Sequence, residues 1–149
     1  MEICTAFGHR DDLKNITVPL REAVREMIEV NNVTTFICGS NGDADATFAC
    51  VVREFRRENP SIKLILVKPY FSNELNTNKE YYEAMYNDII VPEELANVFH
   101  KGAIKKRNRW VVDKCDYIID CTFRDFGGAY DAVAYAKKQK KKIIKLFNK

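Results

Sequence analysis

The sequence has few of the residues that build metal centres and disulfide scaffolds. It contains only two histidines, His9 and His100, and without clustered cysteines these do not predict a metal site. The five cysteines are an odd number and form no CxxC pair, which argues against a disulfide framework or a zinc finger. Unpaired cysteines inside apolar runs are typical of a reducing compartment. We therefore expect a cytoplasmic protein that binds no metal.

Long apolar segments, targeting signals and internal repeats are also missing. No apolar run approaches the roughly 20 residues needed to span a bilayer. The N-terminus lacks the basic and apolar regions of a signal peptide. Because no linker or low-complexity stretch interrupts the 149 residues, we expect a single domain over residues 1–149 without membrane association.

Charge of one sign is not in large excess, since the formal net charge is +3. Much of that charge comes from the lysines in residues 137–145. Lysines at the end of a helix stabilise the negative end of its dipole, so a solvated helix terminus explains them. No aromatic-rich strip and no known reader motif accompanies this run, and we therefore do not expect nucleic acid as a partner.

The chain does contain a regular alternation of apolar runs and amphipathic helical patterns. The apolar runs predict strands at 3–7, 34–38, 63–67, 88–91, 117–121 and 143–147. The helical patterns lie at 18–30, 44–58, 77–86, 101–114 and 129–139. Strands that are apolar on both faces and separated by helices indicate a sheet covered on both sides. We predict an α/β fold, a Rossmann-like three-layer α/β/α sandwich with a mostly parallel sheet.

A glycine loop joins the second predicted strand to the second predicted helix. It consists of Gly39, Ser40, Asn41, Gly42 and Asp43. Glycines let a ligand approach the backbone, and the unpaired amides at a helix start attract anions. The loop matches neither GxGxxG nor a P-loop, so it predicts no standard dinucleotide site and no ATPase. Asp43 could bind a ribose hydroxyl; the alternative is a plain connection whose glycines serve packing.

A second glycine pair, Gly127 and Gly128, opens the last predicted helix. Asp131 follows in the first turn, where it either stabilises the helix dipole or faces a ligand. Polar residues also follow other predicted strands, namely Gly8, His9, Arg10, Pro69 and Tyr70. In a parallel sheet ligands bind outside the carboxyl ends of the strands. We therefore expect all these residues to line one cleft that binds a small phosphorylated ligand.

The helix predicted at 101–114 carries basic residues beside its apolar stripe. Helical geometry places Arg107 and Asn108 next to the stripe and Arg109 far around the helix, in solvent. A charged side chain beside the core is costly unless it is paired. Arg107 therefore contacts either a ligand phosphate or an aspartate of the protein itself, and the sequence leaves both open.

Several motifs taken together resemble one known superfamily. In chain order they are FGHR, CGSNGDAD, LILVKPY, KRNRWVVDKCDYIID and a late GG. They resemble the SLOG superfamily of Rossmann-like proteins, and its YpsA-like branch above all, over nearly the whole chain. The resemblance implies a single SLOG domain, a homo-oligomer and a nucleotide or NAD-derived metabolite as ligand, with no cofactor firmly implied.

The same superfamily includes the LOG phosphoribohydrolases, which cut the N-glycosidic bond of nucleoside 5′-monophosphates. Their helical arginine and their PGGxGTxxE motif resemble Arg107 and the glycine pair 127–128. However, Asn108 stands where they have lysine, and Val133 or Ala134 stands where they have glutamate. An oxocarbenium-like transition state needs a nearby carboxylate, and this chain lacks the matching one.

The resemblance therefore implies a sensor or regulator that binds a nucleotide or an NAD-derived metabolite. The alternative is an N-glycosidase acting on nucleoside 5′-monophosphates, in which Asp131 or Asp43 would replace the missing acid. A third possibility is an interaction protein whose cleft no longer binds a ligand.

Overall fold

The computed structural model describes residues 2–11, 15–95 and 100–147. Its strands are β1 (Ile3–Phe7), β2 (Thr35–Cys38), β3 (Lys63–Val67), β4 (Asp88–Ile90), β5 (Tyr117–Asp120) and β6 (Lys142–Lys145). Its α-helices are α1 (Thr17–Glu29), α2 (Asp43–Glu58), α3 (Glu74–Thr77), α4 (Lys79–Met85), α5 (His100–Lys114) and α6 (Gly128–Lys138), and a 3-10 turn covers Glu93–Leu95. The predicted elements are confirmed, with the helix expected at 77–86 present as α4, whereas α3 and the 3-10 turn were not predicted.

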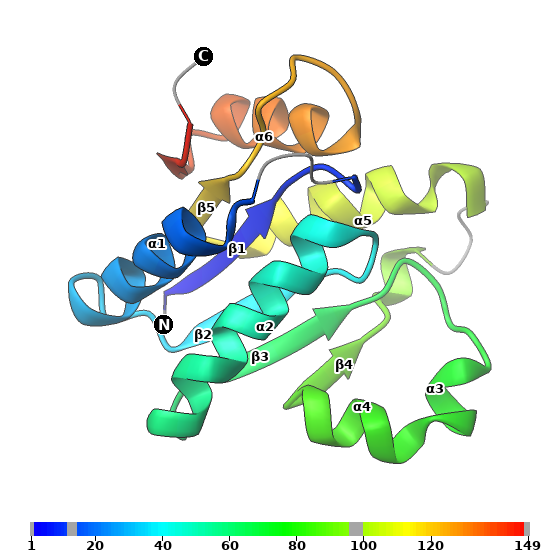
Figure 1. Ribbon diagram of the computed structural model, residues 1–149. Coiled ribbons are helices and arrows are strands. Elements are labelled where there is room, and N and C mark those ends of the chain that lie inside the picture. Colours follow the sequence, from blue (N-terminus) through cyan, green and yellow to red (C-terminus); the bar gives the residue numbers. More distant parts are fainter. Residues whose placement is uncertain (1, 12–14, 96–99, 148–149) are drawn as a thin grey trace.

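The described strands form one sheet of order β4-β3-β2-β1-β5-β6, and all neighbouring strands run parallel (Figure 1). This confirms the predicted Rossmann-like α/β fold. The chain starts in the middle of the sheet at β1, builds outward to β4, and returns to the other side of β1 as β5. The strand order therefore reverses between β1 and β5. Phe7 pairs with Asp120, so the loops that follow these two strands leave the sheet side by side.

The core lies on both faces of the sheet. Helices α1 and α2 pack on one face, where Phe36 of β2 meets Phe48 of α2 with ring centroids 6.2 Å apart. Helices α5 and α6 pack on the other face around Ile118 of β5. Burying each large apolar side chain stabilises the fold by about 1.5–3 kcal/mol, which explains why the strands are apolar on both sides.

Helices α2 and α6 begin and end with charges that complement their dipoles. Helix α2 carries Asp43 and Asp45 in its first turn and arginines in its last turn. Helix α6 follows the same pattern, with Asp131 near its start and Lys137 and Lys138 at its end. None of the helices in the described part of the chain is long and apolar enough to cross a membrane.

Candidate functional site

A cavity of about 230 Å³ opens where the strand order reverses, at the carboxyl ends of β1 and β5. We call it the switch-point pocket. Its walls come from the loop after β1, the region around the start of α2, the first half of α5 and the segment that leads into α6. Predicted site residues that line it are Gly8, His9, Arg10, Asn41, Arg107, Asn108, Gly127 and Gly128.

Arg107 is the charged residue at the base of this pocket, and only 5% of it is exposed. Its Nε donates to Oδ1 of Asn108 at 2.9 Å, and its Nη1 donates to the carbonyl oxygen of Val67 at 3.3 Å. Among the described residues no carboxylate forms an ion pair with it. Burial lowers the pKa of Arg107, and the charge of Asp45 opposes that shift only in part. The aspartate salt bridge that the sequence left open is thus not formed.

Asn41 adds a second unused donor to the same pocket. Its own backbone N–H donates to Oδ2 of Asp45 at 2.8 Å, which fixes the loop before α2. Its side-chain Nδ2 is buried and finds no hydrogen-bond partner in the described part of the chain. Buried polar groups in native proteins are nearly always satisfied, so this donor is an exception at the wall of the pocket.

The first glycine loop differs from the expectation, because the chain itself uses its helix amides. The N–H of Asp43 donates to the carbonyl oxygen of Arg10 at 2.8 Å, and the N–H of Ala44 donates to that of His9 at 3.4 Å. Gly42 has φ +116°, and a β-carbon there would lie 2.5 Å from the Cα of Arg10. Close packing against the loop after β1 therefore explains this glycine, and the chain itself takes the first two amides of α2.

The second glycine loop is open. Gly127 caps α6 with φ +102°, which favours glycine, and Gly128 is the first helical residue. A β-carbon at either position would meet no atom within 4 Å. Among the described residues, no hydrogen-bond acceptor takes the N–H groups of Gly128 and Ala129, which both line the switch-point pocket. The start of α6 therefore keeps the anion-binding character that the sequence predicts for both loops.

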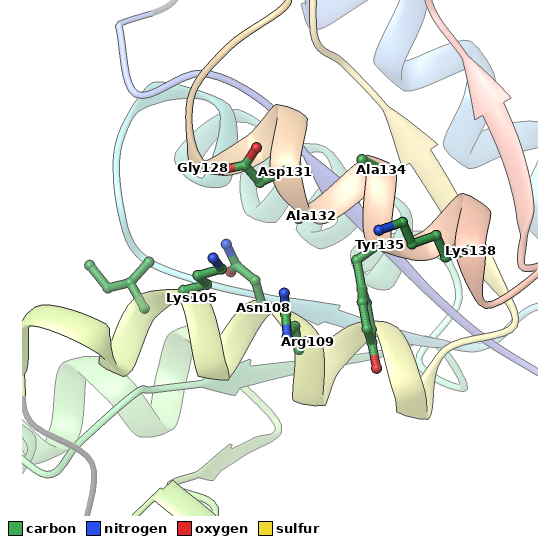
Figure 2. Close-up of a pocket in the computed structure, with 10 residues that line it drawn as sticks. Lys105, Asn108, Arg109, Gly128, Asp131, Ala132, Ala134, Tyr135 and Lys138 are labelled. Carbon is green, nitrogen blue, oxygen red and sulfur yellow. The ribbon is translucent and has the colours of Figure 1, made fainter.

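A groove of about 390 Å³ continues from the pocket between α5 and α6 (Figure 2). We call it the helix groove. Ile104, Asn108 and Gly128 line both the pocket and the groove, so the two cavities adjoin each other. Figure 2 shows Asn108 and Arg109 on the side of α5 that faces α6, and Tyr135 of α6 extending toward α5.

The helix groove is mainly basic. Lys105 and Arg109 reach it from α5, and Lys138 reaches it from α6. The guanidinium of Arg109 lies over the ring of Tyr135, 5.1 Å from its centroid. Asp131 is an exposed carboxylate on the α6 side. The sequence placed Arg109 in solvent and did not identify this groove, although the i,i+4 spacing of Lys105 and Arg109 put both on one helix face.

An exposed aromatic ring stands at the pocket. Phe126 is 68% exposed, and it lies in the segment between β5 and α6, just before the glycine pair. Arg124 of the same segment pairs with Asp11, with Nη1 and Oδ1 2.9 Å apart. Phe126 is not among the predicted site residues, because nothing in the local pattern tells an exposed phenylalanine from a buried one.

Other predicted residues lie away from the pocket. Pro69 and Tyr70 follow β3, which is separated from β1 by β2, and they line neither the pocket nor the groove. Gly39 is also outside the lining, because the guanidinium of Arg107 fills the space beside it. Ser40 is exposed and does not line the pocket either.

No family model and no curated protein sequence matches the chain. Solved structures of DNA processing protein A do match it in fold. One is from Helicobacter pylori and concerns the single-stranded DNA binding of that protein, with 19% identity over 99% of this chain and a TM-score of 0.67. Another is from Streptococcus pneumoniae, with 14% identity over 97% of this chain and a TM-score of 0.68. This chain spans 66% and 50% of those chains, respectively.

These matches correct two expectations drawn from the sequence. The sequence predicted a sensor of nucleotides or NAD-derived metabolites, with an N-glycosidase as the alternative. Both predictions conflict with the structural neighbours, which are DNA processing proteins, and the structure of one of them concerns its binding of single-stranded DNA. The expectation that nucleic acid is no partner is overturned by the same finding. That expectation considered only the lysines in residues 137–145. The basic groove instead combines cations from two separate helices, α5 and α6.

Proposed function

We propose that the protein binds single-stranded nucleic acid along the switch-point pocket and the helix groove. The observation that carries the proposal is the guanidinium of Arg107, which is buried without a carboxylate partner at the point where a basic groove begins. Burying this cation is costly, the charge of Asp45 offsets the cost only in part, and an anionic ligand group would offset more of it. The fold shared with DNA processing protein A supports the same class of ligand.

The ligand group in the pocket is a backbone phosphate. The free amides of Gly128 and Ala129 and the guanidinium of Arg107 approach the pocket from different sides. Amides at a helix start and a guanidinium are both strong donors to phosphate oxygens. The unsatisfied Nδ2 of Asn41 provides a further donor.

The helix groove extends the site beyond a single nucleotide. A strand that leaves its first phosphate in the pocket passes next between Asn108 and Gly128, which line both cavities. It then meets Lys105, Arg109 and Lys138, whose charges suit the following phosphates. A small metabolite held in the pocket would leave these cations unused, which is why a strand fits the surface better.

Phe126 gives the site a surface for a base. Proteins that bind single strands without sequence preference combine a basic groove with exposed aromatic rings on which bases stack. A paired base in a duplex does not offer its face in this way. The exposed ring of Phe126 beside the phosphate donors therefore favours single strands over duplexes.

Carboxylates at the same surface limit the affinity. Asp11 and Asp45 line the pocket, and Asp131 lines the groove. Asp11 pairs with Arg124, and Asp45 accepts a hydrogen bond from the loop before α2, so both have structural roles. Asp131 remains exposed at the groove and would repel a neighbouring phosphate. We therefore expect moderate affinity that depends strongly on salt.

The experiment is fluorescence anisotropy with a rhodamine-labelled oligo(dT) of about 15 nucleotides, at several salt concentrations. Binding of single strands loses affinity with a slope of about −0.7 in log K against log salt for each phosphate contact, so four contacts predict a slope of about −3. A labelled hairpin duplex of the same length is the control. Equal affinity for the duplex, or no binding of oligo(dT) at low salt, would contradict the proposal.

We further propose, on the order of the sequence motifs, that residues 1–149 form one domain of the SLOG superfamily, close to its YpsA-like branch, and that it assembles as a homo-oligomer. The motifs that support this are the FGHR, CGSNGDAD and KRNRWVVDKCDYIID segments. The Rossmann-like fold that the superfamily implies is present. Light scattering of the purified protein tests the homo-oligomer directly.

A further inference from the structure

His9 joins the two loops that form the switch-point pocket. It follows β1 and is only 7% exposed. Its Nε2 accepts hydrogen bonds from the backbone N–H groups of Phe123 and Arg124, both at 3.1 Å. These two residues begin the β5–α6 segment, residues 123–128, which contains Phe126 and leads into the open start of α6. A single ring nitrogen thus holds the β5–α6 segment against the loop after β1.

Two further contacts join the same loops. The ring of His9 packs edge-on against Phe123, with centroids 4.6 Å apart and planes at 74°. Arg124 reaches back to Asp11, two residues after His9. The loop after β1 therefore contacts the β5–α6 segment through both His9 and Asp11.

The two hydrogen bonds from these backbone amides require one protonation state of the imidazole. A histidine nitrogen accepts a hydrogen bond only when it carries no proton, so Nε2 must be unprotonated and the ring neutral. Protonation turns Nε2 into a donor that faces two other donors. Both hydrogen bonds are then lost, and the amides of Phe123 and Arg124 are left without their acceptor.

We propose that His9 is a positioning residue whose neutral imidazole holds residues 123–128 in the binding conformation, and whose protonation releases them and weakens ligand binding. The binding part of this inference rests on the proposed function, whereas the release of the segment does not. Protons bind to the released form, so affinity falls as the pH falls. Histidine is the side chain whose ordinary titration lies between pH 5 and 8.

Neighbouring charges do not supply the same pH response. Among the described residues that line the pocket with His9, the charged groups are Arg10, Asp11, Asp45, Arg107 and Arg124. The arginines stay protonated throughout this range. The hydrogen bond from Arg124 lowers the pKa of Asp11, so this ion pair persists when the pH falls to about 5.

The first experiment needs no ligand. Amide hydrogen exchange and NMR shifts of Phe123 and Arg124 are followed from about pH 8 to about pH 5, the range in which histidine titrates. We expect both amides to lose protection together as His9 titrates. In His9→Gln the carboxamide oxygen replaces the acceptor but does not titrate, so protection should persist at low pH. Amides that stay protected in the parent protein after His9 is protonated would overturn the inference.

The second experiment measures rhodamine-labelled oligo(dT) binding over the same pH range. The parent should lose about tenfold or more in affinity at low pH, which corresponds to two lost hydrogen bonds, and His9→Gln should show a flat profile. His100→Gln, at the only other histidine of the sequence, should behave as the parent does. A fall of equal size in His9→Gln, or a fall abolished by His100→Gln, would overturn the inference.

These two experiments separate the inference from the proposed function. If the parent protein binds no oligo(dT) at any pH, the proposed function fails, and the exchange of Phe123 and Arg124 still decides whether His9 holds the segment. If oligo(dT) binds and its affinity does not change with pH, the proposed function stands and the role of His9 is wrong.

Discussion

The guanidinium of Arg107 occupies the space beside Gly39 in which any other residue would place its β-carbon. An oxygen of Asp45 lies 2.8 Å from the same point. Glycine at position 39 therefore makes room for the side chain of a residue on α5 rather than for a ligand or a turn. The arrangement explains how a bulky cation is buried at the base of the pocket.

This relationship predicts opposite effects for two glycine substitutions. Gly39→Ala should lower the free energy of unfolding by roughly 1–3 kcal/mol, because the added methyl group collides with Arg107. Gly128→Ala adds its methyl group where no protein atom lies within 4 Å, so the fold should keep its stability. That methyl group should nevertheless weaken oligo(dT) binding, since it points into the space of the ligand. Urea denaturation and anisotropy measure the two effects, and a loss of stability without loss of binding in Gly128→Ala would contradict the open-loop assignment.

Replacing Arg107 should separate binding from stability. Burial lowers the pKa of Arg107, which means that folding disfavours the charged form and the cation costs stability at neutral pH. Arg107→Met should therefore leave the free energy of unfolding about unchanged, because lost hydrogen bonds offset the relief. Affinity for oligo(dT) should fall by about 10- to 150-fold, as expected for a charge-assisted contact of about 1.5–3 kcal/mol.

The matched control for Arg107 is Arg109→Ala, which removes an exposed charge from the same helix. It should weaken binding much less than Arg107→Met, because an exposed contact is screened by water and salt. Equal losses from the two variants would reject Arg107 as the main phosphate contact. A large loss of stability in Arg107→Met with unchanged affinity would assign it a structural role instead.

The base-stacking role of Phe126 is tested by a pair of exposed phenylalanines. Phe126→Ala should weaken oligo(dT) binding by about 5- to 150-fold, since stacking of a base on an aromatic ring contributes about 1–3 kcal/mol. Phe71→Ala is the control, because Phe71 is 57% exposed but lines neither cavity. Anisotropy at one fixed salt concentration compares them. Equal affinities of the two variants would show that no base stacks on Phe126.

The contribution of the helix groove appears in the salt dependence. The triple variant Lys105→Ala, Arg109→Ala and Lys138→Ala should flatten the slope of log K against log salt by about 2, because each lost phosphate contact changes it by about 0.7. The control triple variant removes three exposed cations from other elements, at Arg57, Lys63 and Lys79. It should leave the slope unchanged. Similar slopes for both triple variants would place the strand outside the helix groove.

Much of the fold follows from the sequence because its signals are local. Apolar runs such as 35–38 are buried on both faces, and this pattern by itself indicates a parallel sheet between layers of helices. The glycine pair at 127–128 lies between an apolar run and a helical pattern, and this placement predicts a helix start. The position of Arg107 beside an apolar stripe likewise predicts its burial, since helical periodicity fixes which side chains face the core. Helix α3 (Glu74–Thr77) was not predicted, because four residues are too few to show a helical period.

Only the tertiary structure decided which predicted groups form the site. The two glycine loops look equivalent in sequence, but the carbonyl oxygens of His9 and Arg10 close the first and no described residue closes the second. Pro69 lies outside the site because β2 separates its strand, β3, from β1. A single sequence does not reveal this strand order. The basic groove joins Lys105 of α5 to Lys138 of α6, residues that the chain brings together only when both helices pack on the same face of the sheet. Local pattern sets which residues are buried and which are helical, whereas the partners of a hydrogen bond or a charge come from distant segments, and their positions depend on the packing of the whole sheet.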